Sequence, residues 1–159
     1  MHVVFRESRG LEETATPRDL GQDPADLVVL SFSDSDLAAF AAGWRRGRAA
    51  LPSLRLANLA ELRHPLSVDT YIERTLSHAR GILVRLIGGE PYWSYGLSAV
   101  HRLARERGIA LVVLPADGRD DLRLDEFSTL PVSTLRRLKV LCDKGGPVAA
   151  QAVIAQLAL

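Results

Sequence analysis

Short apolar runs alternate with helical patterns along most of the chain. The apolar runs are bounded by Pro, Gly, Asp and Ser, which is typical of strands buried within a sheet. Between them, apolar residues recur every three or four positions, as they do on the buried face of an amphipathic helix. We therefore expect four strands, at Leu27–Leu30, Leu54–Asn58, Ile82–Ile87 and Ile109–Leu114.

The residues next to these strands predict where the helices begin and end. A Ser or Asp side chain can accept a hydrogen bond from a free N–H in the first turn, so Ser33, Asp34 or Ser35 is expected to cap the first helix. Ser67 is the expected cap of the second helix, and Gly81 its C-terminal glycine. A third helix is expected from about Tyr92 to Gly108.

This alternation predicts an α/β fold with a parallel sheet and helices on both faces, flavodoxin-like or Rossmann-like. The sheet has four strands, or five if His2–Phe5 adds an edge strand. In a flavodoxin-like order 2-1-3-4, ligands bind where the first and third strands end. We divide the chain into a three-layer α/β domain, residues 1–120, and a helical segment, residues 121–159, expected to continue in a longer protein. Its extra C-terminal helices are expected at about 122–127, 133–142 and from Pro147 onward.

Charge is unevenly distributed, although the total is only +1. Residues 1–36 carry a net −5 and residues 37–107 a net +6, and 18 of the 20 basic residues are Arg. The basic part could attract a carboxylate or phosphate, or it could reflect the composition of the genome. The small total gives no support for binding to nucleic acid or to a membrane.

Several function classes are disfavoured by missing motifs. We find no P-loop, no G-x-G-x-x-G, no zinc-binding H-E-x-x-H or C-x-x-C, and no G-x-S-x-G elbow. There is no signal-peptide pattern and no apolar run near 18 residues. The lone cysteine, Cys142, reads as a small buried apolar residue and fits a cytoplasmic location.

Two loops flank the expected switch point and hold most of the candidate binding residues. In the first, Ser31, Ser33 and Asp34 offer hydroxyl and carboxylate oxygens that could bind a metal or a phosphate. The simpler alternative is that this loop only caps the helix that follows it.

The second loop contains Gly88, Gly89, Glu90, Tyr92 and Trp93. The glycines allow a sharp turn that presents N–H groups to an anion, and the two aromatic rings could cover a flat ligand. Alternatively, the loop is a tight turn with Trp93 packed in the core or against another domain.

His64, before Pro65, is the histidine best placed for a role. One histidine without a nearby carboxylate or cysteine defines no site, so we assign no metal site and no catalytic residue.

Several blocks, in order, resemble the start of the large subunit of the aerobic, ATP-dependent cobaltochelatase of the CobN type. The resemblance covers residues 1 to about 150, and no single block is a catalytic signature. The blocks are Phe5–Glu13, Ala25–Leu37, Leu54–Leu59, His64–Asp69 and the loop from Gly88 to Gly96.

The resemblance implies a role in cobalamin biosynthesis. The family subunit is much longer than this chain, is related to the large subunit of magnesium chelatase, and binds the tetrapyrrole. The reaction it implies is that of a ligase forming nitrogen–metal bonds, with Co²⁺ inserted into hydrogenobyrinic acid a,c-diamide. Two smaller partner subunits form the motor that hydrolyses ATP with Mg²⁺, and the remainder of the large subunit is a further partner. We expect no cofactor on this segment and no catalysis by it alone.

Three functions remain open at this point. The segment could help to enclose the tetrapyrrole, with His64 and Glu90 as the candidate base or ligand. It could be a docking domain without a ligand, with Val148–Leu159 in the contact. It could also be a free-standing flavodoxin-like binder of a small phosphorylated molecule.

Overall fold

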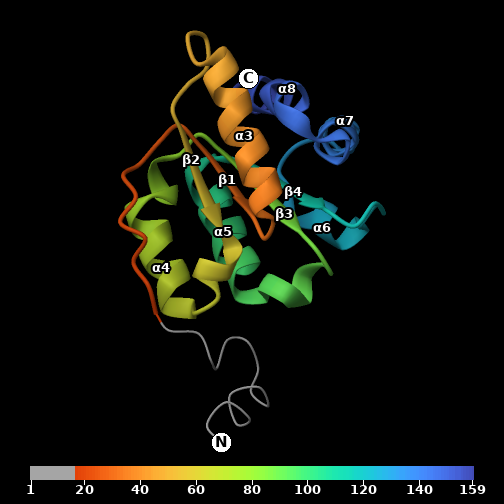
Figure 1. Ribbon diagram of the computed structural model, residues 1–159. Helices are drawn as coiled ribbons and strands as arrows, with labels where there is room; N and C mark the ends of the chain where they lie inside the picture. The colour runs from red at the N-terminus through yellow and green to blue at the C-terminus, as the bar shows by residue number, and fades with distance from the viewer. Residues whose placement is uncertain (1–16) are drawn as a thin grey trace, which may run out of the picture.

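A parallel sheet of four strands lies at the centre of the computed structural model, which describes residues 17–159 (Figure 1). Its order is β2-β1-β3-β4 and each adjacent pair is parallel, as predicted. The possible edge strand at residues 2–5 lies outside the described residues. The strands are β1 (Leu27–Ser31), β2 (Leu54–Asn58), β3 (Gly81–Leu86) and β4 (Ala110–Pro115).

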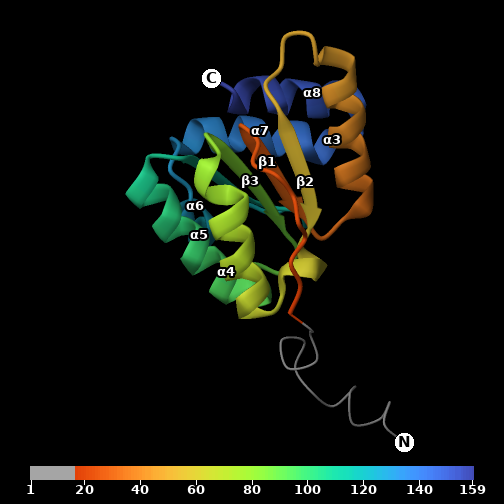
Figure 2. The ribbon, with the colours of Figure 1, turned by 90° about the vertical axis from the view of Figure 1, so that its left-hand side faces the viewer.

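Helices cover both faces of this sheet, which confirms the α/β class (Figure 2). Helices α4, α5 and α6 pack on one face, and α3, α7 and α8 on the other. The α-helices are α3 (Asp34–Gly47), α4 (Pro65–Arg74), α5 (Ser94–Arg107), α6 (Leu122–Phe127), α7 (Val132–Lys144) and α8 (Gly146–Leu157). Three 3₁₀ helices are Leu59–Leu62, Leu76–His78 and Glu90–Trp93.

Continuous apolar strands are expected when a parallel sheet is covered on both sides. Alternate residues of β1 enter opposite cores: Val28 and Leu30 face α4 and α5, whereas Leu27 and Val29 face α3, α7 and α8. All four are almost completely buried. The lack of polar alternation in the strands therefore follows from the two helical layers.

Two of the predicted helix boundaries were wrong. His64, not Ser67, caps α4: its Nδ1 accepts a hydrogen bond from the N–H of Leu66 at 3.1 Å, and Pro65 occupies the first turn, where no N–H is needed. Gly81 does not end the helix, since α4 ends at Arg74, and it is instead the first residue of β3.

The third helix also starts later than expected. Residues Glu90–Trp93 form a separate 3₁₀ turn, and α5 begins only at Ser94. Its end is as predicted, because Gly108 adopts the left-handed conformation that closes the helix.

The C-terminal helices α7 and α8 pack onto one face of the sheet. Helix α8 lies against α3, and its inner side reaches the sheet through Val153, Ile154 and Leu157. Gly43 permits this close approach: a Cβ there would lie 2.7 Å from both the Gln151 nitrogen and the Pro147 oxygen. Because both atoms belong to the backbone, a larger residue would have to move α8.

We therefore predict that Gly43→Val lowers the free energy of unfolding by about 2–3 kcal/mol, because the added side chain pushes α8 away from α3. The matched control is Ala38→Val at an exposed position of the same helix, where we expect a loss below about 1 kcal/mol. Urea unfolding of the two variants checks this. Equal losses would show that the approach of α8 to Gly43 is not tight.

Candidate functional site

The two candidate loops lie next to each other because β1 and β3 are neighbours that end at the same edge. Ser31 is in register with Arg85, so the loop after Ser31 and the loop after Leu86 leave the sheet side by side. This edge lies in the lower half of the fold in Figure 2, where the arrowhead of β2 points downward. It is the place where such folds commonly bind ligands.

The first loop is held together by its own hydrogen bonds. The hydroxyl of Ser31 donates to Asp36 Oδ2 at 3.0 Å and accepts from the N–H of Ser33 at 3.0 Å. The hydroxyl of Ser33 accepts from the N–H of Asp36 and so caps α3. Asp34 Oδ1 accepts a hydrogen bond from Asn58 Nδ2 at 2.9 Å. Three candidate residues of this loop therefore already have partners within the domain.

Arg85, which the sequence analysis did not select, lies at the centre of this edge. Its side chain is 5% exposed, and its guanidinium donates to Asp36 Oδ2 at 2.7 Å and to Asp143 Oδ1 at 2.9 Å. Lys139 then binds the other oxygen of Asp143 at 2.8 Å. In the sequence, Arg85 could have been noticed as the single charged residue within the apolar run Ile82–Ile87.

This ionic cluster, Asp36–Arg85–Asp143–Lys139, joins β3 to α3 and α7. Its charges alternate in sign and sum to zero. Among the described residues, Arg85 Nε is buried without a hydrogen-bond partner. A buried guanidinium is stable only when carboxylates compensate for its lost hydration, so each acid in the cluster supports Arg85.

The second loop makes the sharp turn that its glycines predict. Gly88 and Gly89 have φ values of 87° and 83°, which other residues rarely adopt. The ring of Tyr92 lies directly over Gly88, where a Cβ would come within 2.3 Å of it. Gly88 therefore supplies both the turn and the space for the ring.

The two aromatic residues of this loop point to different environments. Trp93 is 3% exposed, packs in the core with α4 and α5, and donates through Nε1 to the Leu62 carbonyl at 2.9 Å. Tyr92 is 61% exposed, and the neighbouring Ile87 is 52% exposed. Only Tyr92 is available to a partner, so the loop does not present a pair of rings.

Glu90 and His64 also have partners inside the domain. Both carboxylate oxygens of Glu90 accept from Arg123, each at 3.1 Å, and these hydrogen bonds raise the pKa of Arg123 above its usual range. His64 caps α4, as described above. No direct contact brings Glu90 to His64, so they do not form a proton-transfer pair.

Cys142 lies on α7 beside the ionic cluster and is half-buried. Burial raises the pKa of its thiol to about 12, and the nearby charge of Arg85 offsets part of this effect. The thiol is therefore protonated and unreactive near neutral pH, in keeping with the predicted apolar role.

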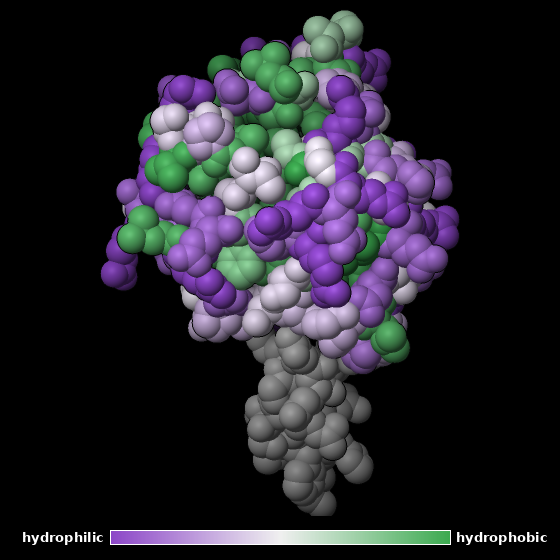
Figure 3. Space-filling view, turned by 180° about the vertical axis from the view of Figure 1, so that it is seen from behind, coloured by the Kyte–Doolittle hydropathy of each residue, from purple (hydrophilic) through white to green (hydrophobic). Residues whose placement is uncertain are grey.

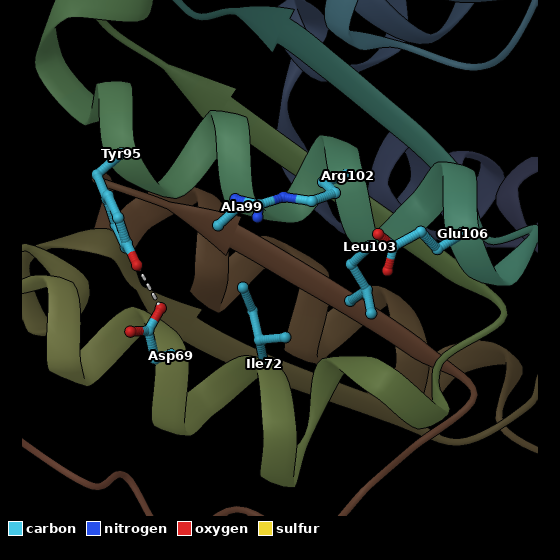
Figure 4. A pocket seen from close by; sticks show the side chains of 7 residues that line it. All are labelled: Asp69, Ile72, Tyr95, Ala99, Arg102, Leu103 and Glu106. Carbon is cyan, nitrogen blue, oxygen red and sulfur yellow. Dashed lines mark hydrogen bonds between the residues drawn. The ribbon is translucent and has the colours of Figure 1, made fainter.

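A cavity of about 250 Å³ lies between α4 and α5, next to the end of the second loop (Figure 4). Tyr95 and Asp69 point toward each other across it and share a hydrogen bond of 2.6 Å, which raises the pKa of Tyr95. The remaining lining residues are Ile72, Ala99, Arg102, Leu103 and Glu106.

Within residues 17–159, no three His, Cys, Asp or Glu side chains are grouped so that they could hold a metal ion. In the same part of the chain, no helix has the length and apolar character needed to cross a membrane.

Comparison with known proteins shows what the chain resembles. It is 40% identical over 146 residues to the aerobic cobaltochelatase subunit CobN of a Sinorhizobium species, a match that covers 92% of this chain. The resemblance to CobN is confirmed. The CobN subunit of Pseudomonas aeruginosa matches over the same length with the same identity. This chain spans only 11% and 12% of the two CobN subunits, so it corresponds to a small part of each.

A solved structure supports the fold independently. The catalytic subunit of cobaltochelatase from Mycobacterium tuberculosis superposes with a TM-score of 0.66, at 24% identity, over 82% of this chain and 10% of that one. No family model matches the chain. The structural match bears on the fold alone, and it agrees with the α/β architecture.

The contrast between Trp93 and Tyr92 gives a direct test. Trp93→Ala should lower the free energy of unfolding by about 3–5 kcal/mol, because it leaves a cavity in the core and an unpaired carbonyl at Leu62. Tyr92→Ala should cost less than about 1 kcal/mol, because most of that ring is in solvent. Denaturant unfolding measures both, and similar losses for the two variants would contradict the placement of these rings.

Proposed function

We propose that this chain is the N-terminal module of a CobN-type large subunit and that it acts chiefly in the assembly of that subunit. Through this role it contributes to the ATP-dependent insertion of Co²⁺ into hydrogenobyrinic acid a,c-diamide in cobalamin biosynthesis. The observation that supports the proposal is the 40% identity to CobN along 92% of the chain. A match of that extent covers the core, the loops and the surface together.

The state of the candidate site favours assembly over catalysis. Ser31, Ser33 and Asp34 bind within the first loop or to β2, Trp93 fills the core, and Glu90 pairs with Arg123. A catalytic group must be free to reach its substrate. These side chains are instead engaged in holding the domain together, so we assign no catalytic residue to this module.

The partners follow from the same proposal. They are the remainder of the large subunit and the two smaller motor subunits, which would supply ATP hydrolysis with Mg²⁺. The complex would work in the cytoplasm, and cobalt would be its substrate rather than a resident metal of this module.

Contact with the tetrapyrrole is the second candidate, and Tyr92 is the observation that favours it. Its ring is backed by Gly88 and held by the turn that Glu90 anchors to Arg123, while most of its surface is in solvent. Ile87 in the same segment is also exposed, so this loop presents apolar surface that a flat ligand could contact. Arg residues of the basic middle of the chain could then meet the carboxylates of the corrinoid.

Removing this module from the large subunit tests the main proposal. We expect the shortened subunit to lose cobalt insertion by at least about tenfold, because its contact with the rest of the assembly is missing. We further expect this chain, added separately, to co-purify with the shortened subunit and to restore part of the activity. Full activity without the module would contradict the proposal.

The isolated chain also tests the second candidate, contact with the tetrapyrrole. Absorbance titration of this chain with hydrogenobyrinic acid a,c-diamide should give no spectral change at high micromolar concentration if the module serves assembly alone. A change that Tyr92→Ala abolishes and Tyr92→Phe retains would support tetrapyrrole contact. Val140→Ala, at an exposed apolar side chain of α7, is the control.

A further inference from the structure

The outer face of α8 has no charged residue, although it faces solvent. The chain carries no charge after Lys144, so all of α8 is uncharged. Its inner side is buried against α3 and the sheet. Val148, Ala152 and Ala155 follow one another at helical spacing on the outer side, and all three are exposed. The polar side chains of α8 are Gln151 and Gln156, both partly buried, so the exposed outer side is formed by Val and Ala. Surface helices normally carry charged or polar residues on the side that faces solvent.

Helix α5 shows what an ordinary surface helix of this protein looks like. Its inner side is apolar, whereas its outer side carries Arg102, Arg105, Glu106 and Arg107. The charge-free outer face of α8 is therefore a property of that helix and not of the whole surface.

A hollow of about 330 Å³ adjoins this face, where α7 meets α8. Its lining is mostly apolar and includes Leu141 from α7 and Val148 and Ala152 from α8, with Lys144 as its one charged residue. Val148 and Val140, one turn before Lys144 on α7, are each 66% exposed. Seen from behind, green side chains gather toward the end of the molecule that holds α7 and α8 (Figure 3). Side chains of another helix or strand could fill the hollow and pack along the outer face of α8.

We infer that the outer face of α8, together with the hollow between α7 and α8, docks onto another segment of the same large subunit. This inference rests on the proposed function, because it takes its occupant from the subunit to which the module would belong. The chain spans only 11–12% of its CobN relatives, so most of such a subunit is available to cover the face.

The size of the face favours an occupant within the same polypeptide. A helix of 12 residues is about 18 Å long and about 10 Å wide, so its outer side offers roughly 200 Å². A stable complex between separate proteins usually buries about 800 Å² on each partner. A segment tethered by the chain needs less, because its effective concentration is high. A second copy of this chain would need far more surface.

Thiol labelling tests the inference at Ala152. We propose the variant Ala152→Cys in a Cys142→Ala background, both in this 159-residue chain and in the large subunit, with labelling by a maleimide followed by peptide mass spectrometry. We expect labelling to be at least about tenfold slower in the large subunit. Ala38→Cys, exposed on α3, calibrates the reagent in each preparation, and Ala155→Cys repeats the test at a second position.

Equal labelling of Cys at positions 152 and 155 in the two preparations would overturn the inference. The inference would also be overturned if labelling of the isolated 159-residue chain were slow and became faster on dilution, because a second copy of the chain would then cover the face.

Failure here is distinguishable from failure of the proposed function. A large subunit that inserts cobalt while these positions label freely would refute the docking face and leave the function intact. Protection of both positions in a subunit whose activity does not depend on the module would refute the function and leave the docking face intact.

Discussion

The buried guanidinium of Arg85 is the constraint on which the carboxyl edge of the sheet depends. It lies in β3, one of the two central strands, where every neighbour along the strand is apolar. Taking a charge out of water costs several kcal/mol, and only opposite charges at close range offset that cost. Asp36 from α3 and Asp143 from α7 provide them, so two helices are tied to the sheet at the point where β1 and β3 end.

In this arrangement, the polar side chains where β1 and β3 end bind one another. In related architectures the loops after such strands bind a ligand. Here the first loop is drawn inward, because Ser31 and Arg85 both bind Asp36. The second loop turns Trp93 into the opposite core and leaves only Tyr92 outside. These contacts are the reason why we propose a role in assembly, through the outer surfaces, for this domain.

Much of the fold could be predicted because its signals are local. The strands are continuous apolar runs, and the crossover rules for parallel strands leave few possible orders. Two boundaries were wrong because each segment offers two local signals that spacing alone does not rank. Both His64 and Ser67 could cap α4, and Gly81 could either end a helix or begin a strand. The direction of Trp93 was also undecided, because successive residues of a 3₁₀ turn point about 120° apart, and the sequence does not say which of the two rings faces the core.

The ionic cluster could not be predicted in the same way. Its acids lie 49 and 58 positions from Arg85 in the sequence, and only the packing of α3 and α7 brings them together. A lone Arg in an apolar run indicates that partners exist, but it does not say which acids they are. The outer face of α8 is an intermediate case, because its lack of charge is visible in the sequence and its exposure only in the structure.

The free energy of unfolding of Asp36→Asn and Asp143→Asn tests most directly whether these carboxylates serve the fold or a ligand. If they compensate for Arg85, each substitution should destabilise the protein, Asp36→Asn by about 3 kcal/mol and the more exposed Asp143→Asn by less. Residues that are kept for a ligand commonly reduce stability, so their replacement tends to stabilise a protein. An unchanged or increased free energy of unfolding in both variants would contradict this account and would indicate that these carboxylates serve a ligand instead.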